Sequence, residues 1–282
     1  MSDEIAEVFR TFDAQLRATP EDRERLAAER AAVVSALTES GVPVLRVIEA
    51  GAWAHDTAVR GTSALDLVVV LDGPRPRSAA RARELLGAAA AAARGDDAGT
   101  GGVRLTPAFE VPGPSAESDL VVIPDSAGRW VRHRPGARGV LMARIDDDGS
   151  LRMLVRLLLA WKYRSAPAIS SYYLETVAIR QALQQRSFSP LWDLCWIWES
   201  LSTDGLVPVA DPSSPGGSRS IRPAASIARA IESQFALERA ASSARGAVNA
   251  YVDGDLDRVG SYLQALFGED FPAFSDEREP PL

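Results

Sequence analysis

The chain of 282 residues contains one cysteine, two histidines and one lysine, and each scarcity excludes a class of site. Cys195 by itself supports neither an internal disulfide nor a cysteine-built zinc site, and a lone thiol is typical of a reducing compartment. No apolar run reaches the ~18 residues that a membrane-spanning helix needs. The acidic start at Met1–Glu4 lacks the basic segment of a signal peptide. We therefore expect a cytoplasmic protein with no membrane partner.

The charge balance is acidic, with a net charge of -7, and this disfavours binding to a nucleic-acid backbone. A hydrophobic content of 46% is typical of a globular protein with a sizeable core. All basic residues except Lys162 are arginine, which together with the excess of alanine indicates a GC-rich bacterial genome. A lysine that survives such drift suggests a need for a compact ammonium group, although chance survival explains it equally well.

Hydrophobic periodicity predicts a mixed α/β first half. The near-continuous apolar run Leu65–Leu71 predicts a central strand that is buried on both faces. The other elements expected in this half are helices over 3–40 and 77–94, strands over 43–50, 103–111 and 120–123, and a flexible loop over 95–102.

The second half reads as helical throughout, after a run of three aspartates and a glycine at 146–149 that predicts a solvated turn. Helical periodicity covers 150–165, 170–186, 190–203, 222–248 and 255–267, with a loop over 211–217. The spacing of Trp192, Trp196 and Trp198 favours core packing, and lining a pocket is the alternative. We predict an α+β fold with an α/β module over 1–145 and an all-helical module over 146–282.

Residues 51–70, GAWAHDTAVRGTSALDLVVV, resemble the signature of the DNA polymerase-β-like nucleotidyltransferases, a Gly-Ser turn followed by a strand with Asp-x-Asp. Further segments resemble the bacterial cyclic-oligonucleotide synthases, or CD-NTases, in the family's order: Leu158–Lys162, Ile169–Glu175, Asp211-Pro212 and Gly268–Pro272. The resemblance implies a nucleotidyltransferase core with a small mixed sheet, followed by a helical domain like that of oligoadenylate synthase.

Nucleotidyl transfer in that family uses two divalent metals about 3.5–4 Å apart, which three carboxylates hold. Two carboxylates stand at i and i+2 of one strand, because alternate side chains share a face. In this sequence only Asp66 of that pair remains. The resemblance makes four positions degenerate: Ala52 for the Gly-Ser serine, Ala64 for the first aspartate, Val121 for the third aspartate, and Leu159 for a lysine that contacts triphosphate.

Asp119 offers a partial rescue of the metal site. It stands two residues before Val121, about 6.6 Å along the same strand face, and a local bulge brings it into register. Asp66 and Asp119 together then form a site for one Mg²⁺, which needs only one or two carboxylates plus substrate phosphates. The alternative is that Asp66 is a residual polar contact at the strand edge. No cofactor is expected outside this Mg²⁺ alternative.

The resemblance also implies a ligand site from residues that persist. Ser171 matches a serine that contacts the donor phosphate, and Tyr172 matches an aromatic residue that stacks on a base. The complete predicted ligand-binding set is Gly51, Ala52, Ser63, Lys162, Ser171 and Tyr172, with Arg60 as additional positive charge. As alternatives, Ser170 and Ser171 cap a helix that begins near Tyr172, and Tyr172 and Tyr173 are core aromatics.

The two histidines are weaker candidates. His55 stands beside Asp56, and a histidine near a carboxylate can act as a general base at neutral pH, whereas a lone histidine in a turn is usually solvated. His133, between Arg132 and Arg134, is expected in a basic surface loop, with a phosphate or partner contact as the alternative.

Three functions follow from these observations. The first is a pseudoenzyme that has lost two-metal transfer and keeps a cleft for a nucleotide or another small ligand, with a protein partner as a further option. The second is a repurposed, metal-independent enzyme of bacterial secondary metabolism, with His55 or Asp66 in the chemistry and an apolar pocket. The third is an active nucleotidyltransferase with an atypical metal set at Asp66 and Asp119.

Overall fold

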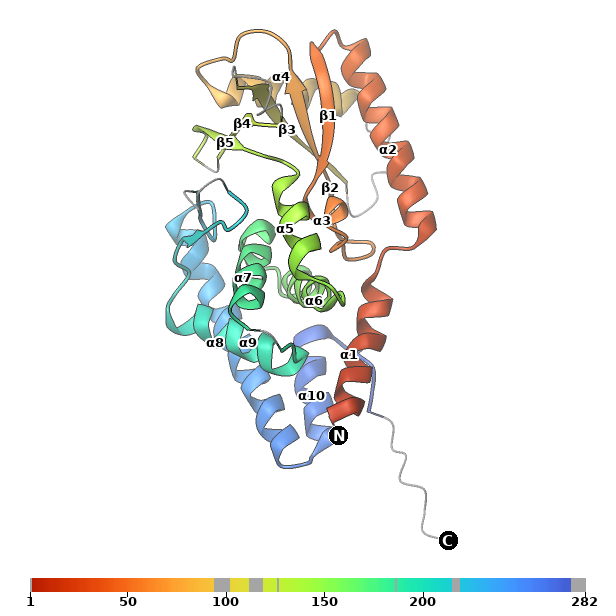
Figure 1. Ribbon diagram of the computed structural model, residues 1–282, viewed down its shortest axis with the longest axis vertical. Helices are drawn as coiled ribbons and strands as arrows, with labels where there is room; N and C mark the ends of the chain where they lie inside the picture. Colours follow the sequence, from red (N-terminus) through yellow and green to blue (C-terminus); the bar gives the residue numbers. More distant parts are fainter. Residues whose placement is uncertain are drawn as a thin grey trace. The chain divides into compact units, whose positions relative to one another are not determined.

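The computed structural model describes residues 2–93, 102–111, 119–125, 127–185, 187–214 and 219–274. The chain divides into two compact units. The sheet unit consists of Arg17–Arg152 and Ala210–Ser220, and the helical unit consists of Met1–Leu16, Met153–Val209 and Ile221–Leu282. Figure 1 shows the elements of both units along the chain.

The sheet unit is built on a five-stranded mixed sheet whose strands follow one another in chain order. Its strands are β1 Val44–Ala50, β2 Leu65–Leu71, β3 Val103–Glu110, β4 Val121–Pro124 and β5 Trp130–His133. The pair β2–β3 is parallel, and the other neighbouring pairs are antiparallel. The predicted central strand is confirmed, since β2 pairs on both sides and only Asp66 within it is less than fully buried.

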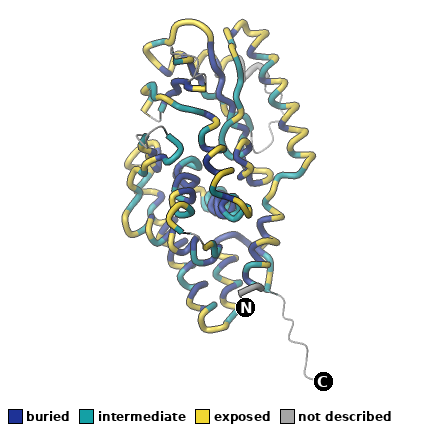
Figure 2. Tube along the Cα trace, viewed as in Figure 1, coloured by how far each residue is buried: buried dark blue, intermediate teal, exposed yellow. Residues whose placement is uncertain are grey.

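The two faces of β2 pack against different neighbours. Helices α2 Pro20–Glu39 and α4 Ala79–Ala93 supply Leu26, Leu37 and Leu86 to a core that includes alternate residues of β2 from Leu65 to Leu71. The opposite face carries a smaller apolar cluster made of Val68, Val70, Ala108, Val121 and Ile123. Asp66 belongs to this second face, because side chains alternate along a strand. Figure 2 shows β2 mostly buried and much of α2 exposed.

The helical unit contains the predicted helices. They are α1 Ser2–Leu16, α6 Ser150–Ser165, α7 Ser171–Gln184, α8 Pro190–Thr203, α9 Ile227–Val252 and α10 Leu256–Phe267, of which α6 begins in the sheet unit. None of the helices in the described residues is both long and apolar enough to span a bilayer. The two short strands β6 Val209–Ala210 and β7 Ser220–Ile221 form a separate sheet beside the loop over 211–217.

Aromatic rings join the ends of the helical unit's sequence. Phe271 is buried and its ring lies 5.5 Å from Phe9, 4.9 Å from Phe12 and 5.6 Å from Phe267. Each such ring pair adds about 0.5–1.5 kcal/mol beyond the burial of its area. The motif at 268–272 therefore closes the unit onto α1.

The structure corrects several expectations. The first 16 residues group with the helical unit, residues 210–220 group with the sheet unit, and the boundary falls after Arg152, in place of a single division at 145/146. Strand β5 and helix α5 Ala137–Ile145 were not expected. Asp146 is buried, where a solvated turn was expected, because its carboxylate accepts the backbone N–H groups of Leu151 and Arg152. Most of the loop predicted over 95–102 lies outside the described residues.

The three tryptophans of α8 differ from one another. Trp198 is fully buried, as the core prediction requires, and it contacts Trp161. Trp196 is 42% exposed, so the core prediction was wrong for this residue, and Trp192 lies half-buried beside it. Residues 192 and 196 share a helix face that turns away from the one occupied by Trp198.

Asp13 and Arg156 form a buried, two-pronged ion pair between α1 and α6. The Nε–Oδ1 distance is 2.6 Å and the Nη2–Oδ2 distance is 3.1 Å, with both side chains 3% exposed or less. Replacing Asp13 with Ala leaves a buried guanidinium without this carboxylate, so we expect a loss of about 3–5 kcal/mol of unfolding free energy. Urea denaturation measures it.

The control is Glu7→Ala, which removes the exposed Glu7–Arg10 pair on the same helix. An exposed pair contributes little, so the urea midpoint of this variant should stay close to that of the wild type. Equal losses in the two variants would contradict the assigned role of the buried pair.

Candidate functional site

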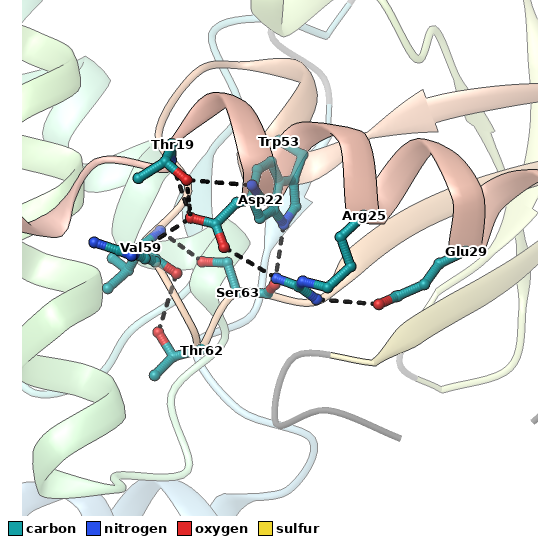
Figure 3. A network of polar contacts seen from close by, with 9 residues as sticks. Thr19, Asp22, Arg25, Glu29, Trp53, Val59, Thr62 and Ser63 are labelled. Carbon is teal, nitrogen blue, oxygen red and sulfur yellow. Dashed lines mark hydrogen bonds and ion pairs between the residues drawn. The ribbon is translucent and has the colours of Figure 1, made fainter. Parts of the chain in front are cut away.

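The segment between β1 and β2 carries most of the sequence signature, and it is held by contacts within itself. Helix α3 Gly51–Ala54 begins directly after β1. The Trp53 indole Nε1–H donates to the carbonyl of Ser63 at 2.9 Å, and the hydroxyl of Ser63 accepts the N–H of Val59 at 2.9 Å (Figure 3). These hydrogen bonds close the loop over 53–63 and fix the position at which β2 begins.

The same loop is tied to the first turn of α2. Arg60 Nε lies 3.4 Å from Oδ2 of Asp22, and Asp22 forms a capping box with Thr19 (Figure 3). The hydrogen bond from the Thr19 backbone N–H lowers the pKa of Asp22 and so keeps this anchor ionised. Arg60, expected as positive charge for a ligand, is thus engaged by Asp22.

The predicted ligand-binding residues of this segment lie in different environments. Ser63 is buried, and its hydroxyl accepts the backbone N–H of Val59. Its role here is therefore to hold the loop together. Ala52 packs against the main core of the sheet unit, and its carbonyl accepts the N–H of Thr57. Gly51 is the exception: it has a φ of +67°, and a Cβ at this position would lie 2.3 Å from Oδ2 of Asp66. The backbone of Gly51 therefore lies directly against the Asp66 carboxylate.

The carboxylate of Asp66 forms an ion pair with Arg104. Residues 66 and 104 are partners in the parallel β2–β3 register, so their side chains share a face. Arg104 Nε lies 2.7 Å from Oδ1, and Arg104 Nη2 lies 2.8 Å from Oδ2. The Asp66 side chain is 28% exposed and that of Arg104 is 58% exposed. This is the paired fork geometry by which a guanidinium holds both oxygens of one carboxylate.

The other expected metal ligands do not assemble around Asp66. Ala64 directly precedes β2. Val121 was expected at the position of the third aspartate, and the register shows that this was wrong. Val121 pairs with Glu110, six residues along β3 from Arg104, so it lies about 20 Å along the strands from Asp66. Asp119 lies exposed in a turn before β4, outside the strand register that would bring it level with Val121. Within the described ranges, no three histidine, cysteine or acidic side chains are grouped for a metal ion. The donor set does not fit a pair of Mg²⁺ ions.

A second set of predicted residues lies in the helical unit. The Nζ of Lys162, near the end of α6, donates to the hydroxyl of Ser171, the first residue of α7, at 2.9 Å. Both side chains are half-buried, as is Tyr172. The structure therefore brings Lys162 and Ser171 together.

The alternatives for these helix residues are resolved in part. Ser170 occupies the N-cap position of α7, but its side chain makes no capping hydrogen bond. Tyr173 is a core aromatic whose hydroxyl donates to the carbonyl of Val207, and burial raises the pKa of Tyr173 to about 12. Leu159, at the position of the family's lysine, is 1% exposed. It belongs to the packed interior.

Each of the two histidines contacts an arginine. His55 is buried, and its carbonyl accepts the Arg152 Nε–H at 3.2 Å. Asp56 is exposed, has a φ of +58° and pairs with Arg23, so the side-by-side sequence positions do not form an acid–base dyad. His133 lies on β5, which corrects the predicted surface loop. Its Nδ1 lies 2.9 Å from Arg219 Nη1.

Burial, reinforced by the charge of Arg219, lowers the pKa of His133 to about 3. The imidazole is therefore neutral at physiological pH and accepts a hydrogen bond from the guanidinium. Close by, Arg138 and Asp211 form a buried ion pair with a distance of 3.1 Å, which ties Asp211 to α5. The one thiol is not a nucleophile here, since burial raises the pKa of Cys195 to about 11.

Comparison with known proteins identifies the fold. No protein-family model matches the chain, and no curated protein is similar to it in sequence. The CD-NTase CdnG of Bradyrhizobium diazoefficiens, solved in complex with GTP, is 15% identical with a TM-score of 0.68, over 95% of each chain. CdnC of E. coli MS115-1, solved as a CdnC:HORMA-deltaN complex, is 15% identical with a TM-score of 0.66, over 96% of this chain and 98% of its own.

A third structure gives the same result. A mutant of the Vibrio cholerae di-nucleotide cyclase DncV, in complex with ATP, GTP and 5MTHFGLU2, is 12% identical with a TM-score of 0.62, over 92% of this chain and 93% of its own. This chain has a CD-NTase-like fold. The predicted α+β architecture, with its mixed sheet and helical second part, is confirmed. At sequence identities this low, the structural similarity supports the fold alone, and the chemistry must be argued from the residues of this chain.

Sequence reasoning missed Arg104. It named Asp66 but read residue 104 only as part of a strand, because an isolated arginine carries no motif. The signal was available in principle: β2 and β3 were both expected, and a parallel register places an arginine of one opposite an aspartate of the other. Only the register itself was lacking.

We expect Gly51→Ala to destabilise the protein by about 1–3 kcal/mol, because the new Cβ strains a left-handed backbone and displaces the Asp66 carboxylate. Gly41→Ala is the matched control: Gly41 has a φ of +68°, and a Cβ there would meet no atom within 4 Å. Thermal or urea denaturation should show a clearly larger loss for Gly51→Ala. Identical losses would mean that backbone strain alone accounts for Gly51.

His133 makes stability depend on pH. The pKa of His133 is about 3 in the folded chain, against 6.5 for an ordinary histidine, so between these pH values the unfolded chain binds a proton that the folded chain does not. Stability therefore falls as the pH drops below about 6.5, by about 2 kcal/mol between pH 7 and pH 5. We expect His133→Gln to lack this contribution. Urea titrations of both proteins at the two pH values measure it, and parallel losses would refute it.

Proposed function

We propose that this protein is a nucleotide-binding relative of the CD-NTases in fold that does not perform two-metal nucleotidyl transfer. The observation that carries the proposal is the state of the expected metal site. The residue two before Asp66 is Ala64, Asp66 itself is held by Arg104, and its register partner on β3 is therefore a cation where a further carboxylate would be needed. A reaction that needs two closely spaced divalent cations has no matching ligand set in this arrangement.

The case for a retained ligand rests on Lys162 and Ser171. A half-buried ammonium held against a hydroxyl between two helices supplies a positive charge and a donor in a fixed geometry. Tyr172, half-buried beside Ser171, offers an aromatic surface for a base. In support, the CdnG and DncV structures that this fold resembles contain GTP, or ATP and GTP.

The two other functions receive less support from the geometry. An apolar pocket for a repurposed enzyme was expected from Val121 and Leu159, yet both are buried, at 0% and 1% exposure. An atypical metal site was expected from Asp66 and Asp119, yet Asp119 lies in an exposed turn. A protein partner remains part of the proposal, since the CdnC neighbour was solved in a complex with HORMA-deltaN.

Calorimetry with ATP and GTP, each in Mg²⁺ and in EDTA, tests the binding. We expect binding that persists in EDTA and weakens about tenfold or more in Lys162→Gln, because a charged hydrogen-bond donor is lost. Ser170→Ala is the control at a neighbouring residue whose side chain makes no capping bond, and it should bind as the wild type does.

A second assay tests the missing reaction. The protein is incubated with all four nucleoside triphosphates and Mg²⁺ or Mn²⁺, and pyrophosphate release is followed. We expect none above a blank without enzyme. Steady pyrophosphate release that Asp66→Asn abolishes would show that the site still performs metal-dependent transfer and would end the proposal.

A further inference from the structure

The Asp66–Arg104 pair is positioned by the sheet and not by flexible side chains meeting by chance. The two residues are register partners in the parallel β2–β3 pair, so their Cβ atoms leave the sheet on the same face. Both guanidinium contacts are short, at 2.7 and 2.8 Å, and each engages a different carboxylate oxygen. A metal ion approaching Asp66 would have to displace a cation that already holds both oxygens.

Arg104 also differs from a metal ion because its guanidinium has N–H donors beyond the two that bond to Asp66. A guanidinium keeps its charge at any pH that a protein tolerates, and it carries more N–H donors than the two that serve Asp66. The side chain is 58% exposed, so its other donors are accessible to a ligand. The backbone of Gly51 at the start of α3 lies against the same carboxylate, with no side chain between them.

We propose that Arg104 takes the place of a divalent metal at this site. Its guanidinium neutralises Asp66 and offers the remaining N–H groups to phosphate oxygens, so that a polyphosphate binds beside Asp66 without metal. The ligand class is a nucleoside triphosphate or an inorganic polyphosphate. This inference rests on the proposed function, because it states how the sheet unit binds the phosphates of a nucleotide.

The two partners of the pair give changes of opposite sign. Arg104→Gln removes the cation, so tripolyphosphate and ATP should bind about tenfold more weakly or worse, in EDTA and in Mg²⁺ alike. Asp66→Asn removes a carboxylate that repels phosphate and occupies the guanidinium, so both ligands should bind more tightly. A metal-mediated site predicts the reverse in Mg²⁺: weaker binding in Asp66→Asn and tighter binding in Arg104→Gln.

The opposite signs separate ligand binding from stability, because both substitutions break the same ion pair and any effect on folding moves both variants together. Arg104→Lys is an additional variant that keeps the charge but loses the fork, and it should bind between wild type and Arg104→Gln. The matched control is Arg46→Gln. Arg46 pairs with Glu110 at 3.3 Å, and its register partner Val70 lies about 13 Å along β2 from Asp66 on the same face. Its polyphosphate affinity should equal that of the wild type.

Isothermal titration calorimetry with tripolyphosphate and with ATP measures the affinity of each of these variants. Equal affinities for the two probes would identify inorganic polyphosphate as sufficient, and tighter binding of ATP would identify the nucleotide; either supports the proposal when the signs are as stated. Changes in the same direction for Arg104→Gln and Asp66→Asn, or unchanged ATP binding in Arg104→Gln, would overturn it while leaving the proposed function intact. Absence of ATP binding by the wild type in both buffers would overturn the proposed function as well.

Discussion

Asp66 and Arg104 face each other across the only parallel strand pair in the described part of the five-stranded sheet, and the character of the candidate site depends on this contact. The guanidinium of Arg104 neutralises Asp66, the carboxylate of the family's metal-binding pattern that this sequence keeps. A carboxylate without a metal needs another cation to balance its charge. Arg104 supplies that cation to Asp66.

The surrounding structure holds this contact in place. The loop over 53–63 is closed by Trp53 and Ser63 and fastened to the first turn of α2, so that β2 begins at a defined position. Gly51 permits the closest approach of backbone to the carboxylate. On the same sheet face, the apolar cluster begins at Val68, two residues along β2 from Asp66.

Low identity with a shared fold has a simple physical basis in this protein. The solved CD-NTase structures are 12–15% identical in the three comparisons, yet they cover more than nine tenths of the chain. Packing requires apolar residues at the right periods and tolerates many choices among them. Metal chemistry requires particular oxygen atoms at particular positions. This chain satisfies the first requirement, and Asp66 has an arginine beside it.

The elements with strong periodicity were predictable, among them β2 and the helices of the second half, because burial on one stripe or on both faces leaves a direct mark on the sequence. Strand β5 and helix α5 left no such mark, since they are short and carry arginines among their apolar residues. For the same reason His133 was expected in a loop, whereas its strand and its contact with Arg219 bury it. The division into units escaped prediction because α1 reaches its partners through Phe271 and Arg156, which are remote in sequence.

The sequence by itself determined that residue 64 cannot supply a carboxylate beside Asp66, because the side chain of Ala64 is a methyl group in any fold. It also determined the fold class, through hydrophobic periods that require only local information. Only the tertiary structure decided what Asp66 does. Its partner is 38 residues away in the chain, and the strand register that brings the two together is set by the packing of the whole sheet. A one-residue slip would place Arg104 on the opposite face.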